Sequence, residues 1–283
     1  MFTLQAPGRL DSLAFSPDGT RLAATGEGVV HVWDLAGRSL VLTDQTGWAT
    51  ARGVFFADAD RLAVLAEGRL SARDLSRSGW QSLAPPGRAG AVAPMPSGRL
   101  LCLLEHPAEL GVFLLPALAP VWVYAPPVPV AALASSPDGT HAALAERDGT
   151  VRLLDAGSGD ELHAWFCGSR DVAGLAVAPG GRAVACRAGQ FLHFHRMPPG
   201  GESDHHRLNA QHFTGLAWHP SGDFFATTKG DGNADFWDGH DGERRQSFGW
   251  GAGALTAIAF DPSGDLCAAT SEDGRVIVWD VDR

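Results

Sequence analysis

A sequence unit of about 41 residues recurs seven times along the chain, and this repeat constrains the fold more than any other feature. The clearest copy is LAFSPDGTRLAATGEGVVHVWDLAG, from Leu13 to Gly37. The residues equivalent to its Phe15 are Phe55, Pro94, Ser135, Val177, Trp218 and Phe260, at successive spacings of 40, 39, 41, 42, 41 and 42 residues. Seven such units cover nearly all of the 283 residues, so the fold must be built from seven similar structural units.

Each unit has the pattern of short strands joined by tight turns. A short alternating run that ends at Phe15 is followed by a Pro-Asp-Gly turn at 17–19. Proline sets φ at the second turn position, and glycine accepts backbone conformations that a side chain forbids. A second apolar run, a turn with Gly28 and a third run that ends in Trp33-Asp34 come next, before a looser fourth run. Period-two alternation with hairpin-type turns predicts four antiparallel strands per unit.

These features resemble the WD-repeat family of β-propellers, whose four-stranded blades surround a central channel. The resemblance covers essentially the full length and implies an all-β, seven-bladed propeller that forms a single domain over residues 1–283. The style of the turns is similar to that of short bacterial WD-repeat proteins. The family's Gly-His dipeptide is absent from every copy, and four copies replace the Trp-Asp ending, by Arg73-Asp74, Leu115-Pro116, Leu154-Asp155 and His195-Arg196. A six-bladed ring would mean that the weak third copy, from Val92 to Pro116, is misassigned.

The two ends of the repeat pattern complement each other. The last copy stops after its third strand, at Val281–Arg283, and therefore lacks a fourth strand. The residues Phe2–Gln5 precede the first copy and have the pattern of a strand. We expect this N-terminal strand to complete the last blade and close the ring, because closure removes the exposed sheet edges that invite aggregation.

The composition argues against nucleic acid and membranes as partners. With 22 Lys plus Arg against 32 Asp plus Glu, the net charge is −10, and most of such a surface repels phosphate backbones and anionic bilayers. The N-terminus shows no basic leader followed by an apolar stretch, and no apolar run is long enough to span a bilayer. The four cysteines show no CxxC spacing, which predicts buried thiols and a cytoplasmic protein; they are Cys102, Cys167, Cys186 and Cys267.

Two polar clusters suggest metal binding at first sight, but the repeat explains both. Five histidines lie between 193 and 212; His195 occupies the tryptophan position of its copy, and His193 occupies a column of varied residues. The adjacent histidines 205 and 206 are expected in a loop. Residues 231–235 imitate the start of a calcium loop, but Phe236 stands where that loop needs glycine. We therefore predict no metal and no cofactor.

The sequence also lacks the common catalytic motifs. It contains no GxSxG elbow, no phosphate-binding GxxxxGK[ST] loop and no HExxH helix. This favours a non-catalytic scaffold for protein–protein interaction, with no catalytic residues. The alternative is a hydrolase- or lactonase-like propeller enzyme that acts at the channel mouth, with a metal held by His or Asp. A third possibility is a structural module that serves a kinase or regulator in a longer gene product or an operon.

The resemblance implies a binding face made by the loops that lead into the first strands and by the turns between second and third strands. On this face we expect a protein or peptide partner to contact Arg9, Trp48, Arg88, Arg170, Asp171, His212 and Trp250. Tryptophan and arginine often anchor interfaces, and a few arginines at one mouth of an acidic protein suit an acidic or phosphorylated segment. The competing interpretation is that the tryptophans pack between blades. We expect a monomer, with no nucleic-acid or membrane partner.

Overall fold

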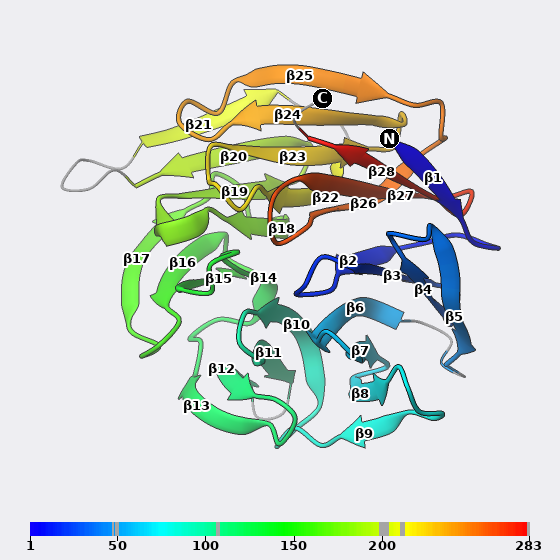
Figure 1. Ribbon diagram of the computed structural model, residues 1–283. Helices are drawn as coiled ribbons and strands as arrows, with labels where there is room; N and C mark the ends of the chain where they lie inside the picture. Colours follow the sequence, from blue (N-terminus) through cyan, green and yellow to red (C-terminus); the bar gives the residue numbers. More distant parts are fainter. Residues whose placement is uncertain (47, 49–50, 106–107, 198–203, 210–212, 282–283) are drawn as a thin grey trace.

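The computed structural model is a closed ring of seven four-stranded antiparallel sheets, which are the blades of a propeller (Figure 1). It describes residues 1–46, 48, 51–105, 108–197, 204–209 and 213–281. Within those ranges the only helical element is a short 3₁₀ turn, η1 (Pro179–Gly181). The fold class expected from the repeat, an all-β propeller with seven blades of four strands, is confirmed.

Six blades take four consecutive strands each. Blade 1 contains β2 (Ser12–Phe15), β3 (Arg21–Gly26), β4 (Val29–Asp34) and β5 (Ser39–Gln45). Blade 2 contains β6 (Ala51–Asp58), β7 (Arg61–Ala66), β8 (Arg69–Asp74) and β9 (Gln81–Leu83). Blade 3 contains β10 (Ala89–Met95), β11 (Arg99–Glu105), β12 (Ala108–Leu114) and β13 (Ala119–Tyr124). Blade 4 contains β14 (Val130–Ser135), β15 (His141–Glu146), β16 (Thr150–Asp155) and β17 (Glu161–Phe166). Blade 5 contains β18 (Val172–Val177), β19 (Ala183–Ala188), β20 (Phe191–Arg196) and β21 (Asp204–Asn209). Blade 6 contains β22 (Phe213–Trp218), β23 (Phe224–Lys229), β24 (Asn233–Asp238) and β25 (Arg244–Gly249).

Blade 7 joins the two ends of the chain. It contains β26 (Leu255–Phe260), β27 (Leu266–Ser271) and β28 (Arg275–Asp280), and its fourth strand is β1 (Phe2–Gln5). β1 pairs antiparallel with β28, so that Phe2 lies opposite Val278. Leu4 and Ala6 are buried in the hydrophobic cluster between blades 7 and 1. The ring is therefore closed by the N-terminal strand, as expected from the sequence, and Figure 1 shows β1 beside β28.

The hydrophobic core is divided among the interfaces between neighbouring blades. Successive side chains of a strand point to opposite faces of its sheet. On β4, Trp33 accordingly packs in a cluster with residues of blade 7, whereas Val32 packs in a cluster with residues of blade 2. The first strands contact one another around the ring, and β26 contacts both β22 and β2. The first strands thus form the inner ring, and the fourth strands lie at the circumference.

The strand register identifies what replaces the missing tryptophans. Trp33 lies opposite Leu22, and the same position holds Arg73, Leu154 and His195 in blades 2, 4 and 5, as expected. In blade 3, however, Leu100 lies opposite Phe113, and β12 ends at Leu114. The assignment of Leu115-Pro116 to this position was therefore wrong by two residues. Several apolar residues follow one another there, and the pairing places the ring of Phe113 in the buried interface between blades 2 and 3.

In blade 2 a charged contact takes the place of the tryptophan. The guanidinium of Arg73 donates a hydrogen bond to the carboxylate of Asp44, which belongs to the fourth strand of blade 1. The indole Nε1 of Trp80 donates to the same carboxylate at 2.8 Å. Blades 1 and 2 are thus joined by a half-buried ion pair and an indole hydrogen bond at this position.

All four cysteines are buried free thiols, as expected from their spacing. Cys102, Cys186 and Cys267 lie on the second strands of their blades. Burial raises the pKa of the Cys102 thiol to about 12. Since the thiolate is the nucleophile and the metal ligand, these groups act as small apolar side chains of the core.

Aspartates hold several of the turns between strands. In blade 4, Ser136 Oγ donates to Asp138 at 2.6 Å, and the backbone N–H of Gly180, in blade 5, donates to the same carboxylate at 2.7 Å. Burial alone would raise the pKa of Asp138, but these hydrogen bonds and those from Thr140 outweigh it and lower the pKa below its ordinary value. In the turn before β28, the hydrogen bond from Arg275 is the main cause that lowers the pKa of Asp273 to about 2.

These carboxyl groups make the fold sensitive to acid. Each has a lower pKa in the folded protein than the ordinary 3.8, so its stabilising contribution is complete above that value and is lost as the pH falls through the folded pKa, which is about 2 for Asp273. We expect the urea midpoint of unfolding to fall steadily from about pH 4 to about pH 2. Asp138→Asn keeps an oxygen acceptor but does not titrate, so its midpoint should fall less steeply over the same range. Equal slopes for the two proteins would contradict this assignment.

Candidate functional site

The face that carries the starts of the first strands is rich in charged side chains from neighbouring blades. Arg9, just before β2, donates from Nη1 to Oε1 of Glu272 at 2.7 Å and from Nε to Oδ1 of Asp11 at 2.6 Å. Glu272 lies in the turn between β27 and β28, so this network links blades 7 and 1. The hydrogen bond to Asp11 is the main cause that raises the pKa of Arg9. About half of the Arg9 side chain remains exposed.

Arg88 makes a similar link between blades 2 and 3. Its Nε lies 2.8 Å from Oε2 of Glu105, and the side chain is 61% exposed. It also lies against the turn of blade 2 at Gly68, where a Cβ would come within 2.4 Å of the Arg88 Nε. Gly68 has a φ of +77°, so both the backbone conformation and the close approach of Arg88 require glycine.

The sector of blades 5 and 6 holds a third group of charges. Arg170 and Asp171 are exposed just before β18. Arg187, on β19, donates from Nη2 to the carbonyl of Ala173 at 3.1 Å and from Nη1 to the carbonyl of Phe213 on β22. Burial lowers the pKa of Arg187, and the charge of Asp171 partly offsets that effect.

Arg187 is the functional candidate that the sequence patterns missed. Its column on the second strands holds Thr25, Ala145 and Thr228 in blades 1, 4 and 6. The signal in the sequence was one arginine at a repeat position that holds small or apolar residues in the other blades. Among the residues that the structure describes, no carboxylate lies within ion-pair distance of Arg187. Its guanidinium is therefore held directly by two carbonyl groups, while the charge of Asp171 acts on it from beyond ion-pair distance.

The two predicted tryptophans pack between blades. The rings of Trp48 and Trp80 meet edge to face at 5.5 Å between their centroids, and both belong to the cluster between blades 1 and 2. The rings of Trp250 and Trp279 lie 4.4 Å apart, between blades 6 and 7. Both predicted residues are half-buried, so part of each ring remains accessible. His212 lies outside the described residues.

The histidines of blade 5 have structural positions. His205 and His206 lie on β21, opposite His195 and Phe194, so the expectation that they lie in a loop was wrong; they belong to the fourth strand of that blade. His195 is buried and stacks on Trp165 of blade 4 at 4.1 Å, which fills the tryptophan position with another aromatic ring. In the described part of the chain, no three His, Cys, Asp or Glu side chains come together as metal ligands would.

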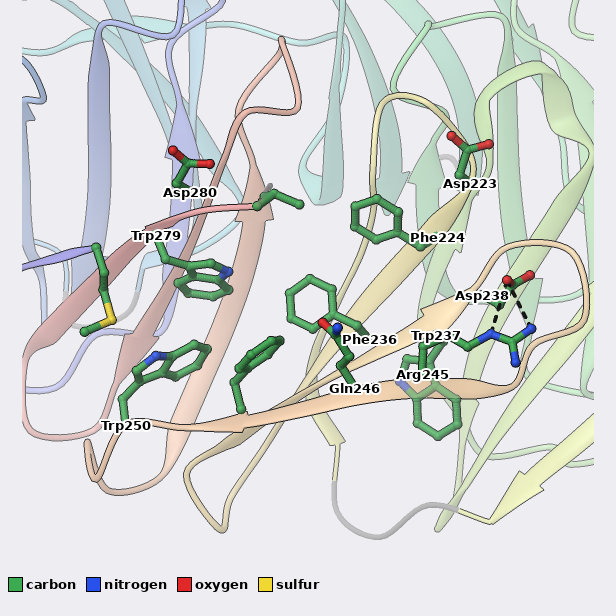
Figure 2. A pocket seen from close by; sticks show the side chains of 13 residues that line it. Asp223, Phe224, Phe236, Trp237, Asp238, Arg245, Gln246, Trp250, Trp279 and Asp280 are labelled. Atoms are coloured by element: carbon green, nitrogen blue, oxygen red, sulfur yellow. Dashed lines mark hydrogen bonds and ion pairs between the residues drawn. The ribbon is translucent and has the colours of Figure 1, made fainter. Parts of the chain in front are cut away.

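A pocket of about 520 Å³ lies between blades 6 and 7 (Figure 2). Its aromatic wall contains Phe236 on β24, Phe248 on β25, Trp250, and Trp279 on β28. The ring of Phe236 lies 5.6 Å from that of Phe248 and 6.3 Å from that of Trp279, so the four rings are continuous. Only Trp250 of this set was among the residues predicted for partner binding. We name this pocket the seam groove, because it adjoins the blade that closes the ring.

The closed ring, its inner first strands and the charged face at the channel mouth together define a β-propeller with a surface suited to recognition. Three segments of the sequence, residues 1–34, 203–238 and 242–280, match the family model described as "WD domain, G-beta repeat". The chain thus has WD40 repeats at three positions of a seven-bladed β-propeller; WD40 propellers commonly mediate protein–protein interaction and are typically non-catalytic. No curated protein matches the chain significantly. Over the described residues, the structure has no helix long and apolar enough to cross a bilayer.

Proposed function

We propose that this protein is a non-catalytic scaffold that binds a protein or peptide segment at the channel-mouth face. The observation that carries the proposal is the half-buried guanidinium of Arg187, which is held by two carbonyl groups beside the exposed Arg170 and Asp171. Arg9 and Arg88 already form ion pairs with neighbouring carboxylates, so a partner would meet them at the rim of the contact. In this proposal the scaffold is a cytoplasmic monomer.

The chemistry of this sector favours an acidic or phosphorylated segment. A guanidinium that is partly shielded from water interacts more strongly with an anion than one in bulk solvent. Arg187 is already oriented by its two carbonyl acceptors, so little side-chain freedom is lost on binding. Asp171 supplies an acceptor for a backbone N–H or a basic side chain of the same segment. The propeller-enzyme alternative has no comparable observation in its favour among the described residues.

Binding of a phosphopeptide tests the proposal. A library of phosphorylated peptides and their unphosphorylated counterparts is screened against the full chain, and Kd is measured for those that bind. We expect Arg170→Glu and Arg187→Gln each to weaken the phosphopeptide at least about tenfold, which corresponds to the loss of one charge-assisted hydrogen bond. The matched control is Arg77→Glu, in the exposed turn between β8 and β9. Equal Kd values for all variants, with folding verified by circular dichroism, would contradict this site.

A further inference from the structure

The seam groove is lined by a polar residue at a fourth-strand position that holds Leu42, Trp122 and Phe2 in blades 1, 3 and 7 and another glutamine, Gln81, in blade 2. On the fourth strands, the residue that pairs with the position just before the tryptophan position of the third strand faces the next blade. In blade 3 this residue is Trp122, whose Nε1 donates to the carbonyl of Ala156 in blade 4 at 3.0 Å. In blade 6 it is Gln246, which pairs with Phe236 and lines the groove. Gln246 leaves open the space that Trp122 fills at its own interface.

Topology explains why no turn between the third and fourth strands covers the groove. At four other interfaces, a residue from the turn after the third strand of the following blade packs over the gap: Trp80, Leu118, Met197 and Arg38. The blade that follows the seam groove is blade 7, whose third strand β28 and fourth strand β1 come from opposite ends of the sequence. No turn joins these two strands; among the described residues, Met1 before β1 and Val281 after β28 line the groove instead. The way the ring closes therefore leaves this interface without a covering turn.

The next interface shows which chemistry suits such a gap. Phe2 occupies the same fourth-strand position in blade 7, and the guanidinium of Arg38 lies 4.5 Å from the centroid of its ring. The planar guanidinium stacks well on aromatic faces, which carry negative charge. Six aromatic side chains line the seam groove, and no such cation–π contact is made to them among the described residues.

The rim of the groove is acidic. Asp223, Asp238 and Asp280 line it with a single basic side chain, Arg245, which lies 3.2 Å from Asp238. Figure 2 shows Asp223 and Asp280 along one side of the hollow and Trp250 on the other. Arg245 also contacts Asp241 and Glu243, so the acidic charge around it exceeds its own. With a net charge of −10 for the chain, the rim repels an acidic partner and attracts a basic one.

We propose that the seam groove is a second docking site, which binds a basic segment of a partner protein through an arginine flanked by apolar residues. The guanidinium lies against Trp250 and Trp279, its charge faces the carboxylates of the rim, and the apolar neighbours cover Phe236 and Phe248. This site is separate from the channel mouth and does not depend on the function proposed for that face. A second copy of this chain is a poor occupant, because two acidic molecules repel each other.

Fluorescence anisotropy with short labelled peptides tests the docking site on the full chain. One peptide carries arginine between two leucines, and the other carries uncharged citrulline, which has nearly the same shape, in its place. We expect the arginine peptide to bind at least about fivefold more tightly, as a desolvated cation–π contact predicts. Equal binding of the two peptides, or no binding of either, would overturn the proposal.

Variants locate the binding on the groove. Gln246→Trp copies the residue that fills the interface of blade 3 and should weaken the arginine peptide at least about tenfold, because the indole occupies the space. Asp223→Asn, which removes one rim charge, should weaken it about two- to threefold. Phe248→Ala removes one exposed ring and should weaken it about threefold. The matched control is Val123→Trp, an exposed position on the fourth strand of blade 3, which should leave Kd unchanged.

The outcomes separate this site from the channel mouth. Arg170→Glu and Arg187→Gln should leave the arginine peptide unaffected, and Gln246→Trp should leave phosphopeptide binding unaffected. If a folded Gln246→Trp variant binds the arginine peptide as well as the wild type does, the groove is not the site. Thermal unfolding of each variant shows that it is folded before its Kd is compared.

Discussion

Deleting residues 1–6 should lower the free energy of unfolding of the whole ring by about 5 kcal/mol or more, and the melting temperature by roughly 10 to 20 °C. The deletion removes β1 and exposes the edge of β28, with which all four residues of β1 pair. It also takes Leu4 and Ala6 out of the cluster between blades 7 and 1. Because that interface holds the ring closed, we expect one cooperative transition at lower temperature rather than a local loss.

Calorimetry and urea unfolding check this result. A milder change, Leu4→Ala, should destabilise by about 2 to 5 kcal/mol, since it leaves a cavity in a packed interface. The matched control is Leu40→Ala on the fourth strand of blade 1, where the side chain is 48% exposed and the loss should stay within about 0.5 kcal/mol. Thermal unfolding unchanged by the deletion would show that β1 does not hold the ring together.

Two blades contain charged triads of opposite sign at equivalent positions. In blade 4 the buried Glu146 lies 3.1 Å from Nε of Arg152, whose Nη1 lies 2.6 Å from Glu161. In blade 6 the equivalent side chains carry the reverse charges: the buried Asp235 lies 3.0 Å from Nζ of Lys229 and 3.5 Å from Nη1 of Arg244. Each triad thus joins the end of a second strand to the third and fourth strands of its blade.

We expect Arg152→Met to destabilise the protein by about 3 to 5 kcal/mol, because it leaves the Glu146 carboxylate buried without its cation. A triple variant copies the triad of blade 6 into blade 4 with the changes Glu146→Lys, Arg152→Asp and Glu161→Arg. This variant should recover most of the free energy of unfolding that Arg152→Met loses. Urea unfolding of the single and triple variants measures the difference. The prediction rests on the equivalence of the two blades, which the strand pairing establishes.

An exposed position provides the control for this experiment. Arg77→Met, in a turn where the side chain is 78% exposed, should change the free energy of unfolding by no more than about 0.5 kcal/mol. If the triple variant is no more stable than Arg152→Met, the two triads are not interchangeable, and the packing around Glu146 decides the loss instead. If Arg152→Met is itself neutral, the buried pair does not stabilise the blade.

The candidate site was accessible from the sequence only in part. The repeat located the starts of the first strands, and Arg9, Arg88, Arg170 and Asp171 are exposed there. Arg187 was missed because it lies inside a second strand, and its place at the mouth depends on carbonyl groups of two different blades. The seam groove was missed because no sequence pattern shows which side chains meet across two blades. An alignment on the first strands does place Gln246 and Trp122 at equivalent positions, but it does not show that this position faces the next blade.

The sequence by itself determined the number of blades, the strands of each blade and the role of the N-terminal strand. These features depend on local alternation, on turn residues and on a regular spacing, all of which are written in consecutive residues. Only the tertiary structure decided which side chains meet between blades, such as Arg73 with Asp44, and which interface stays open. The physical reason is that packing between blades joins residues about one repeat apart, and the fit of two side chains across such a gap leaves no periodic signal in the chain.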